Sequence, residues 1–139
     1  KEQLLIGQDV NHEILSNKMT YARSCDSAFS LGRVAMKNNS NGCFIGYELL
    51  FQFYCDKTWE GNPNKDPIAH FFFEPSNIIP ISIIKGKTAE EAHVASKKAI
   101  LKNIKKVLRK ADAESFAIAE ALWNNYEGQV LLGNSSAIL

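Results

Sequence analysis

The hydrophobic pattern of the chain is clearest between Thr88 and Ala111. Apolar residues recur there at intervals of three and four, which is the spacing of an amphipathic helix. They are Ile100, Leu101, Ile104, Val107, Leu108 and Ala111. Thr88 and Glu91 have the spacing of a capping box, in which two side chains bond unpaired amide groups at a helix start. The pattern therefore predicts a helix over residues 88–111.

Other stretches predict two more helices and three strands. Helical spacing indicates one long helix over residues 9–37 and another over residues 112–126. Short apolar runs, alternating or bounded by turn residues, indicate strands at 45–54, 68–74 and 81–85. The residues expected to face inward from the last helix are Phe116, Ala119, Leu122, Trp123 and Tyr126.

These elements predict an α+β fold in the order helix, strand, strand, strand, helix, helix (α-β-β-β-α-α). Long helices on one face of a small antiparallel sheet of about three strands would bury the apolar faces of both. Residues 130–132 either add a short strand or pack as coil. We expect a single domain over residues 1–139, because the sequence shows no repeat and no convincing domain boundary.

Composition limits the possible partners. The chain is 45% hydrophobic and 22% charged, which is typical of a globular, soluble protein. No apolar run approaches the roughly 20 residues of a transmembrane segment. Sixteen basic residues nearly balance fifteen acidic ones, so an electrostatic partner would have to recognise a local patch and not the field of the whole molecule.

The three cysteines predict free thiols. If residues 43–55 form one strand, Cys43 and Cys55 lie about 40 Å apart at ~3.3 Å per residue, too far for a disulfide. Cys25 and Cys55 fall on predicted apolar faces, where thiols are usually buried and inert. Free thiols favour a reducing compartment. The localisation stays open, because a processed secreted form also fits the sequence.

The predicted helix 88–111 carries its basic residues opposite the apolar stripe. They are Lys98, Lys102, Lys105, Lys106, Arg109 and Lys110. The helix dipole accounts for the cations in the last turns. It does not account for Lys97, Lys98 and Lys102, which lie in mid-helix with no acidic residue four positions away. A cationic face without interleaved carboxylates attracts phosphate groups. We therefore predict a non-catalytic binding domain whose partner is RNA or another anionic molecule.

Two short motifs resemble those of double-stranded-RNA-binding domains. Ser96-Lys97-Lys98-Ala99, followed by Lys102, resembles the lysine motif with which the second helix of that family grips phosphates. Asp66-Pro67-Ile68-Ala69-His70 resembles its Gly-Pro-x-His loop, which enters a minor groove. The predicted order of elements over residues 9–111 is also that of the family. The resemblance implies RNA binding by Lys97, Lys98, Lys102 and His70, through duplex shape and 2′-hydroxyl contacts. We expect Lys105, on the same basic face, to bind nucleic acid with them.

Two other functions stay open from the sequence. The chain could be a protein–protein interaction or cell-envelope accessory domain, in which the lysines only make the surface soluble. It could also be a small enzyme, because Glu90 and His93 align with the apolar stripe and could form a pocket in which His93 acts as acid or base. The sequence lacks a phosphate-binding glycine loop, a metal-spaced Cys/His cluster and a nucleophile elbow. We therefore expect no metal site and no cofactor, and the sequence favours a protein that is not an enzyme.

Overall fold

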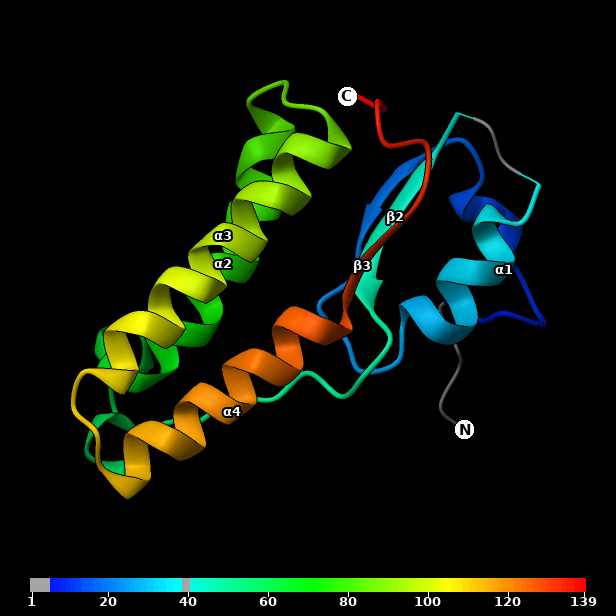
Figure 1. Cartoon of the computed structure of the whole chain (residues 1–139). Coiled ribbons are helices and arrows are strands. Elements are labelled where there is room, and N and C mark those ends of the chain that lie inside the picture. The colour runs from blue at the N-terminus through cyan, green and yellow to red at the C-terminus, as the bar shows by residue number, and fades with distance from the viewer. Residues whose placement is uncertain (1–5, 39–40) are drawn as a thin grey trace.

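A computed structural model describes residues 6–38 and 41–139 and shows four α-helices and a three-stranded sheet in that part of the chain (Figure 1). The helices are α1 (Arg33–Met36), α2 (Pro67–Ile84), α3 (Ala89–Leu108) and α4 (Ala113–Gly128). The strands are β1 (Met19–Tyr21), β2 (Cys43–Tyr47) and β3 (Gln129–Gly133). Short 3-10 or π-helical turns are η1 (His12–Leu15), η2 (Ala28–Gly32), η3 (Lys57–Trp59) and η4 (Pro63–Lys65). The predicted class, α+β with a small sheet and long helices, is confirmed.

The sheet is mixed and not purely antiparallel as predicted. β2 lies in its centre, parallel to β1 and antiparallel to β3. Cys43 and Ile45 of β2 pack against α2 and α3, whereas Phe44 packs against the turns and short helix of the N-terminal region. The long helices α2 and α3 thus lie on one face of the sheet, as predicted, whereas η1, η2 and the short helix α1 cover its other face (Figure 1).

Helix α2 occupies the residues for which the sequence predicted two strands, so the predicted strands 68–74 and 81–85 are wrong. Its start is well specified. The Asp66 carboxylate accepts hydrogen bonds from the amides of Ile68 and Ala69 at 2.8 and 3.0 Å. Pro67 occupies the first turn, where its missing N–H costs nothing. The order of elements consequently differs from the predicted one, because a helix replaces two strands in the middle of the chain.

Helix α3 compensates for a proline inside α2. Pro75 has no N–H to donate to the carbonyl of Phe71, and an interior proline costs a helix about 3 kcal/mol. The side-chain amide of Asn103 donates to that carbonyl instead, at 2.9 Å. The Ser96 hydroxyl donates to the carbonyl of Pro75 at 2.8 Å. These two bonds join α2 and α3 at the point where the proline weakens α2.

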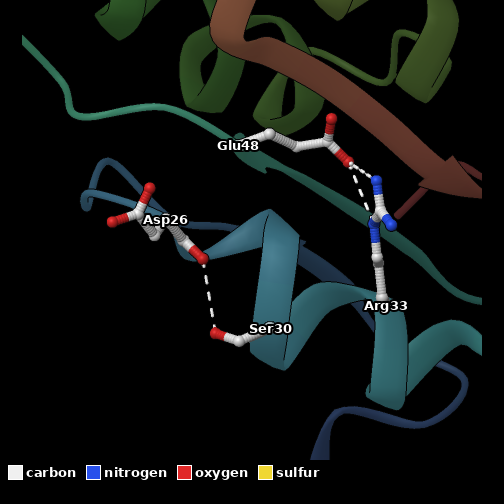
Figure 2. Close-up of polar contacts among 4 residues, drawn as sticks. All are labelled: Asp26, Ser30, Arg33 and Glu48. Carbon is white, nitrogen blue, oxygen red and sulfur yellow. Dashed lines mark hydrogen bonds and ion pairs between the residues drawn. The ribbon is translucent and has the colours of Figure 1, made fainter.

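The predicted helix over residues 9–37 is also wrong, because the chain there forms η1, β1, η2 and α1. Asn17 and Asp26 have left-handed backbone angles, with φ of 60° and 54°, which interrupt a right-handed helix. The final part, η2 and α1, is fixed to the end of β2. Figure 2 shows Arg33 donating from Nε and Nη2 to Oε1 of Glu48, at 3.1 and 2.7 Å. It also shows the Ser30 hydroxyl donating to the backbone carbonyl of Asp26.

The predicted strand over residues 45–54 pairs only as far as Tyr47. Beyond it, side chains of α4 bond the backbone in place of a neighbouring strand. Asn125 accepts from the amide of Gln52 at 2.8 Å and donates to its carbonyl at 2.6 Å. Asn124 donates to the carbonyl of Leu50 at 2.7 Å. The alternating pattern thus marks an extended segment held against a helix.

Helices α3 and α4 match the predicted helices closely. Both begin with capping boxes, Thr88 with Glu91 and Asp112 with Ser115. β3 confirms the short strand that was one of two alternatives for residues 130–132. The core that unites α2, α3 and α4 consists of Phe72, Ile100, Val107, Ile118, Ala121 and Leu122. Because α3 buries one face in this core, its opposite face is left for solvent or a partner.

The cysteines differ in part from expectation. All three are free, and Cys43 is buried, but Cys25 and Cys55 are exposed. Their predicted apolar faces belonged to a helix and a strand that do not form at those residues. Within the described ranges, no helix is both long and apolar enough to cross a membrane.

Candidate nucleic-acid interface

The outward face of α3 carries four cations in one line. Lys98, Lys102, Lys105 and Arg109 follow one another at intervals of four, three and four, which places them on a single stripe of the helix. We call these four residues the basic stripe. At a rise of 1.5 Å per residue, the stripe is about 16 Å long. All four side chains are exposed, and with Leu101 and Lys106 they line an open hollow of about 430 Å³.

The charges of the basic stripe are not neutralised by carboxylates. Within residues 6–38 and 41–139, no ion pair includes any of its four cations. Lys87, in contrast, pairs with Glu91 in the first turn of the same helix, at 3.5 Å. The acidic residues of α3 are confined to that first turn. The stripe therefore presents a positive surface of one sign.

Lys97 was predicted to act with the stripe, but it lies on another side of α3. Its Nζ donates to the backbone carbonyl of Gln129 at 3.2 Å and lies 4.4 Å from the ring centroid of Tyr126. Burial lowers the pKa of Lys97, and the negative charge of Glu127 opposes that shift. Lys97 therefore joins α3 to β3 and α4 and does not belong to the basic stripe.

His70 also lies apart from the stripe. It belongs to α2 and not to a loop between strands, and its Nε2 is 3.4 Å from Oε2 of Glu74. It lines a separate hollow together with Arg23 and Cys55. Of the five residues predicted to bind nucleic acid, the structure therefore brings together Lys98, Lys102 and Lys105 and separates Lys97 and His70.

His93 is held by a backbone contact. Its Nε2 lies 3.3 Å from the carbonyl oxygen of Gln129, the same oxygen that Lys97 contacts. A carbonyl can only accept, so Nε2 carries the hydrogen in this contact. Burial lowers the pKa of His93, against the opposing effects of this hydrogen bond and of the charge of Glu90. Glu90 itself is exposed in the first turn of α3. The contact with Gln129 thus holds His93 between α3 and β3, whereas the side chain of Glu90 lies at the surface.

The lowered pKa of His93 predicts a pH-dependent stability. The unfolded chain takes up a proton near pH 6.5, whereas the folded state takes it up only at lower pH. Stability should be fully present above about pH 6.5 and should fall as pH decreases toward the folded-state pKa. Urea unfolding of the wild type and of His93→Gln, from pH 7.5 down to pH 5, measures this. The difference between the two should shrink on acidification, and parallel curves would contradict the assignment.

Several features of the surface were not foreseen. Arg109 belongs to the stripe, although its position was explained above by the helix dipole. Its spacing of four residues from Lys105 already places the two side chains on one face of the helix. Phe116 and Trp123 were expected to face inward, but they are 56% and 50% exposed. Trp123 stacks on Tyr126, with ring centroids 5.2 Å apart and an interplanar angle of 23°.

The arrangement is suited to binding an anion along the stripe. Among the residues that the structure describes, no three His, Cys, Asp or Glu side chains are grouped closely enough to hold a metal ion. The stripe itself offers guanidinium and ammonium donors, which bind phosphate oxygens. Comparison with protein-family models, with curated proteins and with solved structures finds no match to this chain.

Proposed function

We propose that this chain is a non-catalytic RNA-binding domain that holds phosphate groups along the basic stripe. The observation that supports it is the line of Lys98, Lys102, Lys105 and Arg109, exposed and unpaired with carboxylates in the described structure. The whole chain is nearly neutral, with a formal net charge of +1, so the stripe is a concentration of charge in one place. A polymer with closely spaced phosphates can contact such a line at several points at once.

A nucleic acid fits this surface better than an anionic membrane does. A helix that lies in a membrane interface inserts its apolar face among the lipids. The apolar face of α3 is already used, since Ile100 and Val107 are buried against α2 and α4. What α3 leaves exposed is mainly charge. Contact with a membrane would therefore rest on headgroups alone, without the apolar insertion that anchors interfacial helices.

Among nucleic acids, RNA is favoured by the spacing of the lysines. Lys98 and Lys102 belong to the stretch that resembles the lysine motif of double-stranded-RNA-binding domains. That family has three strands between its helices, where this chain has β2 and α2. The resemblance therefore contributes the lysine spacing and not the fold. DNA of the same sequence is the natural comparison in a binding experiment.

Charge reversal on the stripe is expected to weaken RNA binding strongly. Four phosphate contacts predict that affinity for a duplex falls with salt with a logarithmic slope of about 3 to 4. Lys98→Glu/Lys102→Glu should lower affinity for a 20-base-pair RNA duplex by about 10- to 100-fold and reduce the slope by about 2. Fluorescence anisotropy at 50 and 200 mM salt would measure both quantities.

The matched control is Lys57→Glu/Lys65→Glu, which makes the same change of charge at two exposed lysines of the loop before α2. We expect this variant to bind RNA within about threefold of the wild type at 200 mM salt, where charges that do not contact the RNA are largely screened. Equal losses in the two double variants, or no RNA binding by the wild type, would overturn the proposal.

A protein–protein contact is a second candidate, and one observation favours it. The extended segment after β2 exposes four apolar side chains, namely Leu49, Leu50, Phe53 and Tyr54. Clusters of exposed apolar residues often mark protein interaction sites. If RNA binding does not depend on the basic stripe, this segment becomes the better candidate for the functional surface.

A further inference from the structure

Trp123 is an exposed aromatic ring with a fixed orientation. Its inner face stacks on Tyr126, and half of its surface stays accessible. Tyr126 is itself half-buried against the core of the three long helices and lies under the ammonium group of Lys97. The ring of Tyr126 therefore supports one face of the indole, and Tyr126 is itself held by the core and by Lys97. A rigid, supported, exposed ring is the kind of platform on which nucleic-acid bases stack.

The platform is level with the basic stripe along the axes of α3 and α4. α4 runs back along α3, as Figure 1 shows, so one turn backward on α4 corresponds to one turn forward on α3. Lys97 contacts Tyr126, which places Trp123, three residues earlier, level with Leu101, four residues later. Leu101 lines the same hollow as Lys98 and Lys105. Trp123 is therefore level with the middle of the stripe along the two helix axes.

The exposed faces of α3 and α4 carry charges of opposite sign. α3 presents the cations of the stripe, whereas the exposed face of α4 presents Glu120 and Glu127 near Trp123. These carboxylates repel phosphate, so a sugar–phosphate backbone is favoured over α3 and disfavoured over α4. The uncharged part of a nucleotide, its base, is what α4 can accept.

We propose that Trp123 stacks on an unpaired base of an RNA whose phosphates lie along the basic stripe. This inference rests on the proposed function and makes it more specific, because a base inside a duplex has no free face to stack on. The ligand is then RNA with unpaired nucleotides next to the segment that the stripe holds. Stacking on one aromatic side chain typically changes affinity by about tenfold per base.

The test compares a blunt RNA duplex with the same duplex carrying a six-nucleotide single-stranded overhang. The chain has two tryptophans, so Trp59→Phe leaves Trp123 as the sole indole reporter. In this background the overhang should tighten binding about tenfold and quench the Trp123 fluorescence, whereas the blunt duplex should quench it little. Trp123→Leu should remove the gain from the overhang and leave the affinity for the blunt duplex within about twofold.

Two controls separate the possible outcomes. Phe116→Leu changes an exposed aromatic side chain two turns away on α4 and should retain the full gain from the overhang. Lys102→Glu/Lys105→Glu should weaken both RNAs together. If both RNAs bind in a stripe-dependent way but the overhang gives neither tightening nor quenching, the proposed function stands and this inference is overturned. If neither RNA binds, both are overturned. A DNA duplex with the same overhang shows whether the 2′-hydroxyl contributes.

Discussion

Replacing Gly133 with alanine is expected to destabilise the protein by about 3 kcal/mol or more, because two separate costs add. The backbone at Gly133 has a φ of 82°, a left-handed conformation that costs an L-residue about 1–2 kcal/mol. An added Cβ would also lie 2.5 Å from the carbonyl oxygen of Gly42 and 3.0 Å from Sδ of Met36. Gly133 pairs with Cys43, so relief of the clash would separate β3 from the central strand.

The chain contains a matched control for this prediction. Gly86, after the end of α2, has a similar φ of 76°, but an added Cβ there meets no atom within 4 Å. Gly86→Ala should therefore show the conformational cost alone, about 1 kcal/mol. Urea unfolding of both variants at one temperature gives the two free energies of unfolding. Equal losses would show that the close approach of residue 133 to Gly42 does not matter for stability.

The helices predicted correctly are those whose ends and faces are marked in the sequence. α3 and α4 each begin with a capping box, and the apolar residues of α3 lie on one side only. α2 also has an N-cap, Asp66, but its apolar residues lie on several sides. It packs on α3 with one side, while Phe51 and Phe53 of the extended segment contact Phe73 on another. A helix covered on two sides keeps only a narrow polar face, here His70, Glu74 and Asn77, and so short a polar pattern is a weak signal of the helical period.

The prolines of α2 show a second limit of sequence patterns. Pro75 and Pro80 indicated breaks between strands, since proline usually ends regular structure. The helix continues through Pro75 because Asn103, 32 positions from Phe71 in sequence, supplies the hydrogen bond that the proline cannot. No local pattern contains that information. The hydrogen bond exists only because α2 and α3 pack side by side in the folded chain.

The candidate site was predictable to the extent that it lies on one helix. Lys98, Lys102 and Lys105 share a face of α3 by spacing alone. His70 was misplaced because its element was misassigned, and α2 carries it into a different hollow. Trp123 was missed for another reason. Its position near the stripe depends on how α4 packs against α3, which the pattern within α4 does not specify.

The assignment of residues 67–84 to one helix predicts a large effect at Phe72. This ring is 2% exposed and packs in the core with Ile100, Val107 and Leu122, so it touches both other long helices. Phe72→Ala should lower the free energy of unfolding by about 3–5 kcal/mol, because it removes buried apolar surface and leaves a cavity. The matched control, Phe116→Ala, changes an exposed ring on α4 and should stay within about 0.5 kcal/mol of the wild type.

Urea unfolding followed by circular dichroism measures both variants, and RNA anisotropy adds a second comparison. The basic stripe lies on the face of α3 opposite this core, so Phe72→Ala should weaken folding but leave RNA affinity nearly unchanged wherever the variant is folded. The stripe variants should show the reverse, with weaker binding and little change in stability, since exposed lysines contribute little to folding. If Phe72→Ala and Phe116→Ala cost the same, α2 does not pack against α3 and α4 through Phe72 as described. The position of α3, and with it the geometry proposed for the RNA surface, would then have to be revised.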